Sequence, residues 1–161
     1  MKRVIVIGCP GAGKSTFARK LAAKTGLPLH YLDMIWYRPN RTVIGRDEFD
    51  KRLDKLVNEE EWIIDGNYAR TLPVRLAHCD TVFFFNLPLD VCIEGAKSRL
   101  GKVRLDMPWT DDELDPEFLQ WIIDFPHDVV PEIEHHLKNC NKTIISFHSR
   151  KDADNYIESL K

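Results

Sequence analysis

The sequence lacks the features that mark several classes of protein. No apolar run reaches the roughly 18 residues of a transmembrane helix, so a membrane span is not expected. The four cysteines form no C-x-x-C pair, which disfavours a zinc site. The formal net charge is −2, so the chain has none of the overall basic character that favours nucleic acid, and DNA binding finds no support in its charge. Internal repeats and low-complexity segments are also missing.

One glycine-rich stretch stands out against this background. Four β-branched residues, Val4 to Ile7, run into a turn that fits the pattern G-x-x-x-x-G-K-[ST] from Gly8 to Ser15. The apolar run predicts a strand buried on both faces, and the spacing of Phe17, Ala18 and Leu21 predicts a helix that begins near Lys14. A P-loop requires this context of strand, turn and helix, so we predict a nucleoside triphosphate site here.

Each residue type in the turn suits that ligand. Glycines let backbone N–H groups approach phosphate oxygens, and the start of a helix favours an anion. Lys14 offers an ammonium to the β- and γ-phosphates, and the Ser15 hydroxyl is a ligand for Mg²⁺. The residues expected to bind the nucleotide are Gly8, Cys9, Pro10, Gly11, Ala12, Gly13, Lys14, Ser15 and Thr16.

The uneven charge and the cysteines agree with this site. Residues 1–60 carry 12 basic and 7 acidic residues, whereas residues 111–161 carry 5 and 12, so the basic part surrounds the loop. The position of Cys9 inside the loop favours a reducing compartment, and we expect a cytoplasmic protein. Monomer is only the default expectation.

Strand and helix patterns alternate along the rest of the chain. Apolar runs predict strands over 28–32, 62–64, 81–85 and 142–147. Helical spacing predicts helices over about 46–60, 69–77 and 88–100, a long helical region from Pro116 with Pro126 and Pro131 as kink or break points, and a last helix after Ser149. Residues 34–45 are expected to form a loop.

This alternation predicts a three-layer α/β fold of the P-loop NTPase type, with a five-stranded parallel sheet and helices on both faces. The length of 161 residues suits a single domain, 1–161. Ligands of such sheets bind at the carboxyl ends of the strands, which selects the P-loop, Asp33, Asp65, Asn86 and His148.

Two of these acids have chemical roles to consider. Asp65 follows a buried strand, as a Walker-B acid does, and we expect it to hold Mg²⁺ together with Ser15; a capping role is the alternative. Asp33 either contacts the acceptor, accepting its hydroxyl proton, or merely caps a turn.

The remaining candidates are basic or aromatic. Arg38, Arg41 and Arg70 come from expected loops and could bind an acceptor phosphate, and Trp36 could stack on an acceptor ring. We place the acceptor region at 33–61. Arg99, Lys102 and Arg104 flank a polar stretch, and we interpret 99–116 as a lid that carries arginines over the phosphates, rather than as a plain charged loop.

The motif Gly8 to Ser15 and the strand that ends in Asp65-Gly66 together resemble the adenylate-kinase-like P-loop kinases. Leu29 to Asp33, Trp36, Trp62 to Tyr68 and the segment from Phe118 to Pro126 resemble, more specifically, the branch described as DNA topology modulation proteins. The resemblance implies a core kinase fold with a short lid, ATP and Mg²⁺ as cofactors, lid arginines at Arg99 and Arg104, and a position near the adenine for Arg150.

We therefore predict an ATP- and Mg²⁺-dependent kinase that acts on a nucleotide or another small molecule. Lys14, Arg99, Arg104 and Asp33 are the expected catalytic residues, and Asp33, Trp36, Arg38 and Arg70 the expected acceptor contacts. The alternatives are a nucleotide-dependent regulator of DNA topology and a nucleotide-binding module without catalysis.

Overall fold

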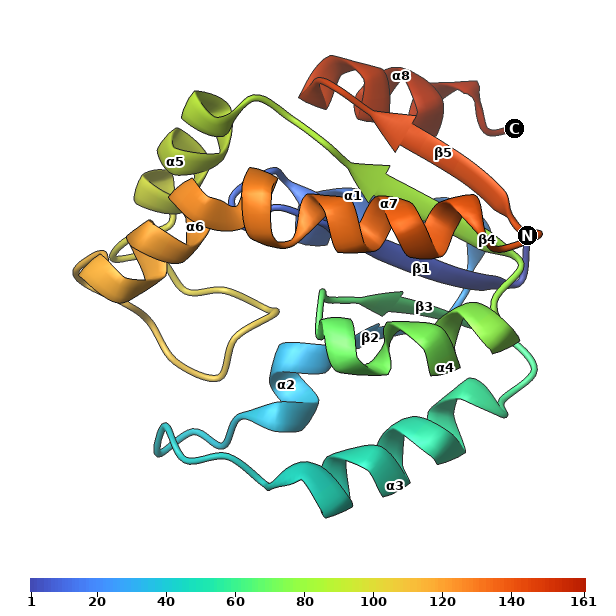
Figure 1. Ribbon diagram of the computed structural model, residues 1–161, viewed down its shortest axis with the longest axis horizontal. Coiled ribbons are helices and arrows are strands. Elements are labelled where there is room, and N and C mark those ends of the chain that lie inside the picture. The colour runs from blue at the N-terminus through green and yellow to red at the C-terminus, as the bar shows by residue number, and fades with distance from the viewer.

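A computed structural model describes residues 1–161 and contains one parallel sheet (Figure 1). The strand order is β2-β3-β1-β4-β5, so β1 lies at the centre. The predicted five-stranded parallel α/β architecture is confirmed. The strands are β1 (Arg3–Gly8), β2 (Leu29–Tyr31), β3 (Trp62–Asp65), β4 (Thr81–Phe85) and β5 (Thr143–Phe147).

Helices cover both faces of this sheet. In Figure 1, α4 and α7 cross in front of the sheet and α1 lies behind it, where it packs beside α8. None of the helices combines the length and the apolar character needed to cross a membrane. The helices are α1 (Lys14–Thr25), α2 (Leu32–Trp36), α3 (Arg46–Val57), the 3₁₀ turn η1 (Ala69–Thr71), α4 (Leu72–His78), α5 (Leu89–Ser98), α6 (Pro116–Asp128), α7 (Val130–Lys138) and α8 (Arg150–Ser159).

The hydrophobic core explains why the central strands are continuous apolar runs. Val4, Ile5, Val6 and Ile7 are all completely buried, because helices cover β1 on both sides. Phe17 of α1 packs edge-on against Phe83 of β4 at 4.8 Å between ring centroids, which fastens the helix after the glycine-rich turn to the sheet.

Helix ends follow the local sequence at two places. α1 stops at Gly26, which adopts the left-handed conformation (φ 76°) and donates its N–H to the Ala22 carbonyl. α8 begins after Ser149, whose hydroxyl accepts a hydrogen bond from the Asp152 amide, as the sequence predicted.

The structure differs from the sequence-based prediction in two segments. Residues 34–45 were expected to be loop throughout, but 32–36 form α2, which is too short for a periodic pattern to reveal. Pro126 was a candidate kink or break point; it lies inside α6 and does not end the helix, whereas the break comes at Val129, beside the other candidate, Pro131. Pro131 then occupies the first turn of α7, where its missing N–H costs nothing.

Strand register determines which residues meet at the carboxyl edge of the sheet. Val6 pairs with Asp65 across β1 and β3, and Gly8 pairs with Phe85 across β1 and β4. The turn after β1 therefore emerges between the ends of β3 and β4, next to the Asp65 carboxylate.

Candidate functional site

The glycine-rich turn joins β1 to α1 in a conformation that only glycine permits at several points. Gly8 has φ 138°, and a Cβ there would lie 2.2 Å from the Phe85 carbonyl oxygen. Gly11 has φ 81°, and a Cβ there would lie 2.0 Å from the Cys92 carbonyl oxygen of α5. The turn thus packs directly on the backbone of β4 and α5, which leaves its other side open to a ligand.

Asn67, just after β3, holds the start of this turn. Its Nδ2 donates to the Gly8 carbonyl at 2.7 Å, and its Oδ1 accepts the Gly8 N–H at 2.9 Å. This reciprocal pair ties the end of β1 to the loop after β3. Because Asp65 ends β3 two residues before Asn67, the same pair of bonds keeps Asp65 close to the turn.

Lys14 opens α1 and folds back over the turn. Its Nζ donates to the Cys9 carbonyl at 3.0 Å. Burial lowers the pKa of Lys14, and the negative charge of Asp65 opposes that effect. The ammonium is thereby held inside the concavity, in position for an anion.

Ser15 and Asp65 form the second pair. The Ser15 hydroxyl donates to Asp65 Oδ2 at 2.5 Å, whereas Asp65 Oδ1 is buried without any hydrogen-bond partner. Burial raises the pKa of Asp65 to about 6, with Lys14 and Ser15 opposing the rise. A hydroxyl next to a carboxylate with a free oxygen is a donor set suited to Mg²⁺, so these two residues fit the predicted metal role.

A cavity of about 570 Å³ lies over the turn. Its lining is strongly basic although the whole chain is slightly acidic, because it gathers seven Lys and Arg residues and only two carboxylates, Asp106 and Asp154. Such a concentration of positive charge favours a polyanionic ligand. The seven basic residues are Lys14, Arg19, Lys20, Arg99, Lys102, Arg104 and Arg150.

The cavity brings many of the predicted nucleotide-binding residues together. Residues 11–16 of the turn line it, whereas Gly8, Cys9 and Pro10 lie beneath, as the support of the loop. Thr16 accepts a hydrogen bond from Arg19 at 3.2 Å. Arg150, at the start of α8, donates to the Gly11 carbonyl at 2.9 Å and so closes one side of the cavity.

Residues 101–115, within the predicted lid, form no regular helix or strand, and 102–106 line the same cavity. Arg99, Lys102 and Arg104 all line it. Burial lowers the pKa of Arg99, with the neighbouring Arg104 charge acting in the same direction, and the Arg99 Nε has no partner. The charges of Asp106, Asp33 and Asp111 act in the opposite direction on Arg99, so its guanidinium is only partly compensated by acidic neighbours.

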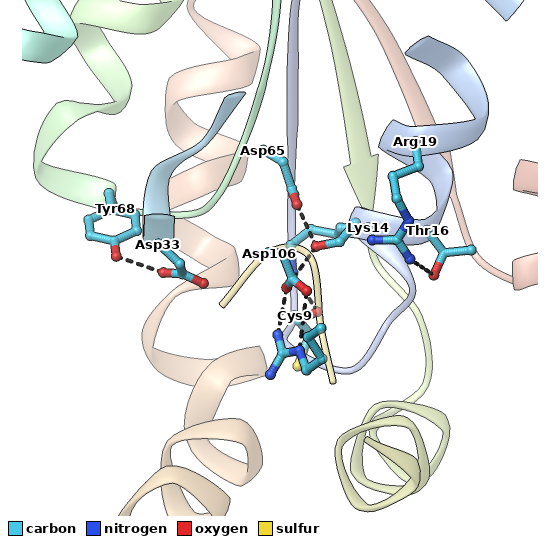
Figure 2. Close-up of polar contacts among 10 residues, drawn as sticks. Cys9, Lys14, Thr16, Arg19, Asp33, Asp65, Tyr68 and Asp106 are labelled. Atoms are coloured by element: carbon cyan, nitrogen blue, oxygen red, sulfur yellow. Dashed lines mark hydrogen bonds and ion pairs between the residues drawn. The ribbon is translucent and has the colours of Figure 1, made fainter. Parts of the chain in front are cut away.

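Asp106 is a member of the site that the sequence analysis missed. It lies in the same segment, its carboxylate accepts two hydrogen bonds from Arg104, and its Oδ2 lies 3.2 Å from the Ser15 Oγ (Figure 2). Burial acts to raise the pKa of Asp106, but the hydrogen bonds and charge of Arg104 outweigh it and hold the pKa below its usual value.

Asp33 lies beside this group, in the first turn of α2. Figure 2 shows it paired with Tyr68, whose hydroxyl donates to Asp33 Oδ1 at 2.6 Å. Burial raises the pKa of Asp33, the Tyr68 hydrogen bond opposes the rise, and the charges of Asp106, Lys14 and Arg104 also act on it. The sequence placed Asp33 at a strand end, but β2 stops at Tyr31.

None of the predicted acceptor contacts, Asp33 included, lines the cavity. Arg38 donates to the Val43 carbonyl at 2.9 Å within its own loop, and Arg70 pairs with Asp50 at 2.7 Å on the outside of α3. Trp36 packs edge-on against Phe49 at 5.5 Å between centroids, as a residue bordering the core. His148 is exposed, and its ring contacts the Asn86 carbonyl at 3.3 Å.

Arg41 connects the predicted acceptor region to the predicted lid. Its guanidinium lies over the Trp109 ring at 5.1 Å and pairs with Asp111 at 3.6 Å. Tyr37 packs edge-on against the same Trp109 ring at 5.0 Å. These contacts link residues 37–41 with residues 109–111. Segments from the predicted acceptor region and the predicted lid therefore pack against each other.

The fold places the chain in one structural class, the α/β proteins with the P-loop fold, in which a glycine-rich loop follows a central strand. No protein-family model and no curated protein matches the sequence. Among solved structures, a shikimate kinase from Bacteroides thetaiotaomicron matches with a TM-score of 0.62 and 16% identity, over 99% of this chain and 96% of that one. An unliganded sugar kinase from a Janibacter species matches with a TM-score of 0.57 and 17% identity, over 98% and 91% of the two chains. The chain has the fold of these kinases, and these two structures do not show the DNA topology modulation branch.

The raised pKa of Asp65 predicts a dependence of stability on pH in the absence of metal. The folded protein binds the Asp65 proton up to a pKa of about 6, against an ordinary value of 3.8, so the free energy of unfolding falls as the pH rises through that window. Asp65→Asn removes this cost, and we expect the variant to exceed wild type at pH 8 by up to about 3 kcal/mol.

Chemical denaturation in EDTA at pH 8 and at pH 4 tests this. The advantage of the variant should disappear at the lower pH, where wild-type Asp65 is largely protonated in the folded state. A variant that is less stable than wild type at pH 8 would show that the Asp65 carboxylate is satisfied in the fold.

Proposed function

We propose that the protein is an ATP- and Mg²⁺-dependent phosphotransferase that moves a phosphoryl group to a hydroxyl of a small molecule. The observation that carries the proposal is the basic cavity over the glycine-rich turn, where backbone amides, Lys14 and two half-buried arginines face one space of about 570 Å³. A triphosphate matches both the charge and the shape of that space.

The roles of the basic residues follow from the chemistry of phosphoryl transfer. Charge spreads over the oxygens of the transferring group, so positioning and electrostatic stabilisation supply most of the rate. Lys14 would bind the β- and γ-phosphate oxygens from the side of the turn. Arg99 and Arg104 would approach them from the lid and exclude water, which limits wasteful hydrolysis.

Ser15 and Asp65 would hold Mg²⁺, because the hydroxyl and the unpartnered Asp65 Oδ1 are the hard oxygen donors at the floor of the site. The ion supplies charge neutralisation between the phosphates when it is bound. Arg150 would lie near the adenine, as the resemblance to adenylate-kinase-like kinases implies; it lines the cavity and is fixed to the Gly11 carbonyl.

The acceptor would bind beside Asp33. A buried carboxylate with a raised pKa is a stronger base than an exposed one, and Tyr68 fixes its orientation, so it suits removal of a hydroxyl proton. An acceptor phosphate would need an arginine clamp, but Arg38 and Arg70 are bound elsewhere. Both kinases with this fold are named for small molecules, shikimate and a sugar, which supports the same class of acceptor.

A screen of acceptors tests the proposal. Purified protein with Mg²⁺ and ATP is offered sugars, polyols, hydroxy acids, nucleosides and nucleoside monophosphates, and ADP release is measured. We expect release with one of the hydroxyl compounds. Asp33→Asn should then lower kcat by roughly 10²–10⁴-fold, whereas Asp50→Asn, which changes an exposed acid, should not.

Two results would contradict the proposal. One is transfer to nucleoside monophosphates alone, which would remove the role of Asp33 as base. The other is rapid ATP hydrolysis that needs no acceptor, since a site that excludes water should not release phosphate to it.

A further inference from the structure

Asp106 has an unusual position for an acid in a lid. It belongs to a polar segment whose other residues are exposed or half-buried, yet only 7% of its own surface is accessible. Its carboxylate reaches the floor of the cavity, where Oδ2 accepts a hydrogen bond from the Ser15 hydroxyl at 3.2 Å. A carboxylate that lines a cavity built for phosphates opposes the charge of the ligand, so its presence there needs a reason.

The reason lies in what converges on Ser15. The Ser15 Oγ lies 2.5 Å from Asp65 Oδ2 and 3.2 Å from Asp106 Oδ2. One hydroxyl hydrogen serves a single acceptor at a time, so three oxygens with two negative charges share one proton. Figure 2 shows the carboxylates of Asp65 and Asp106 directed towards the same point beside Lys14.

An independent observation also indicates a cation. Asp65 is 5% exposed, and its second oxygen, Oδ1, has no hydrogen-bond partner. A buried carboxylate oxygen without a partner is costly unless a ligand completes it. The hydroxyl and the two carboxylates are all hard oxygen donors, the kind that Mg²⁺ and Mn²⁺ prefer.

We propose that Asp106 is a third protein ligand, direct or through one water, of the divalent cation that accompanies ATP. This inference rests on the proposed function. The metal site is then assembled from three parts of the chain: the glycine-rich turn with Ser15, the end of β3 with Asp65, and the lid with Asp106. The cation, rather than the nucleotide alone, fastens the lid over the phosphates and keeps Arg104 beside them.

The remaining coordination must come from the nucleotide. The structure contains no group of three His, Cys, Asp or Glu side chains within reach of one metal ion. Mg²⁺ in phosphoryl-transfer sites is commonly bound by one or two carboxylates together with phosphate oxygens and water. Two carboxylates and a hydroxyl are therefore a suitable number of protein ligands. Because the other ligands would come from the nucleotide and water, we expect tight metal binding only when the nucleotide is present.

The test uses Asp106→Asn, which keeps the shape of the side chain and an oxygen that can still accept from Arg104. The control is Asp112→Asn, the same change of charge at an exposed position of the same segment. Mn²⁺ binding is followed by electron paramagnetic resonance in the presence of a non-hydrolysable ATP analogue. Affinity for the analogue is measured separately in EDTA, and melting temperatures confirm that each variant folds.

We expect the Mn²⁺ dissociation constant of Asp106→Asn to rise by about tenfold or more, because a ligand has been lost. In EDTA the same variant should bind the analogue as tightly as wild type or more tightly, because a negative charge near the phosphates has been removed. Asp112→Asn should match wild type in both measurements.

Other outcomes overturn the inference. Unchanged Mn²⁺ affinity in Asp106→Asn means that the metal does not use this residue. Weaker binding of the analogue in EDTA by the same factor as with Mn²⁺ means that Asp106 only positions Arg104. Wild-type protein that binds no analogue overturns the proposed function itself, and the metal site with it, so the wild-type arm separates that failure from a failure of Asp106 alone.

Discussion

Lys14→Ala should reduce phosphoryl transfer on the order of 10³-fold while the protein remains folded. Lys14 Nζ is fixed at the Cys9 carbonyl, inside the concavity of the turn, where it would meet the charge that develops on the β- and γ-phosphates. Removing one preorganised charge of this kind from a site sheltered from water costs about 10²–10³-fold or more in rate. The measurement is kcat with the acceptor found in the screen.

The fold should tolerate this change. Burial lowers the pKa of Lys14, so holding the ammonium in place is a cost to the folded state, and we expect no fall in melting temperature. Lys24→Ala, at the exposed end of the same helix, is the matched control and should keep wild-type activity. A Lys14→Ala variant that turns over at the wild-type rate would remove the glycine-rich turn from the chemistry.

Arg75→Ala should be the most destabilising single substitution in the loop system behind the site. Arg75 of α4 is completely buried, and burial lowers its pKa to about 10. Its guanidinium donates to the carbonyls of Gly66 at 2.8 Å and Tyr68 at 3.2 Å, and also to that of Asn67. These bonds satisfy three backbone carbonyl groups of the tight loop that follows β3.

Truncation leaves these buried carbonyls without a donor and opens a cavity. Each unsatisfied group costs about 1–3 kcal/mol, so we expect a loss of roughly 3–5 kcal/mol in the free energy of unfolding. That is a large part of the stability of a domain this size, and it corresponds to a fall of about 10 °C in melting temperature.

Two comparisons sharpen this prediction. Arg75→Met restores apolar volume but no donor, so it should remain well below wild type if the hydrogen bonds matter. Arg70→Ala removes an exposed arginine paired with Asp50 and should change the melting temperature little, because exposed ion pairs are weak. An Arg75→Ala variant that melts with wild type would show that the loop after β3 holds its shape without this residue.

Loss of Arg75 should also affect the candidate site. The loop it supports carries Asn67, which clamps Gly8, and Tyr68, which orients Asp33. An Arg75→Ala variant should therefore lose activity even at temperatures where it remains folded. This residue was not among the sequence candidates, although its place between Leu72 and Leu76 on the buried side of a helix was a usable signal.

The parts of the molecule that could be predicted from sequence are those in which neighbours in the chain are neighbours in space. The turn from Gly8 to Ser15 is one such segment, since its strand, glycines and helix are consecutive. Asp65 was found because a buried strand ending in an acid is a local pattern. The parallel sheet followed from the alternation of strands and helices.

The parts that could not be predicted join residues distant in the chain. Asp106 meets Ser15 across 91 positions, Asn67 meets Gly8 across 59, and Tyr68 meets Asp33 across 35. No periodicity connects such residues, because strand order and register bring them together. For the same reason the sequence could not tell that Arg38 and Arg70 are bound away from the cavity.

Titration of Mg²⁺-ATP into the folded protein, followed by calorimetry, tests the central claim most directly. The account predicts a saturable heat with one site per chain, and its loss in the Lys14→Ala variant. Well-folded wild-type protein that gives no heat of binding, at nucleotide concentrations in the millimolar range of cellular ATP, would contradict it.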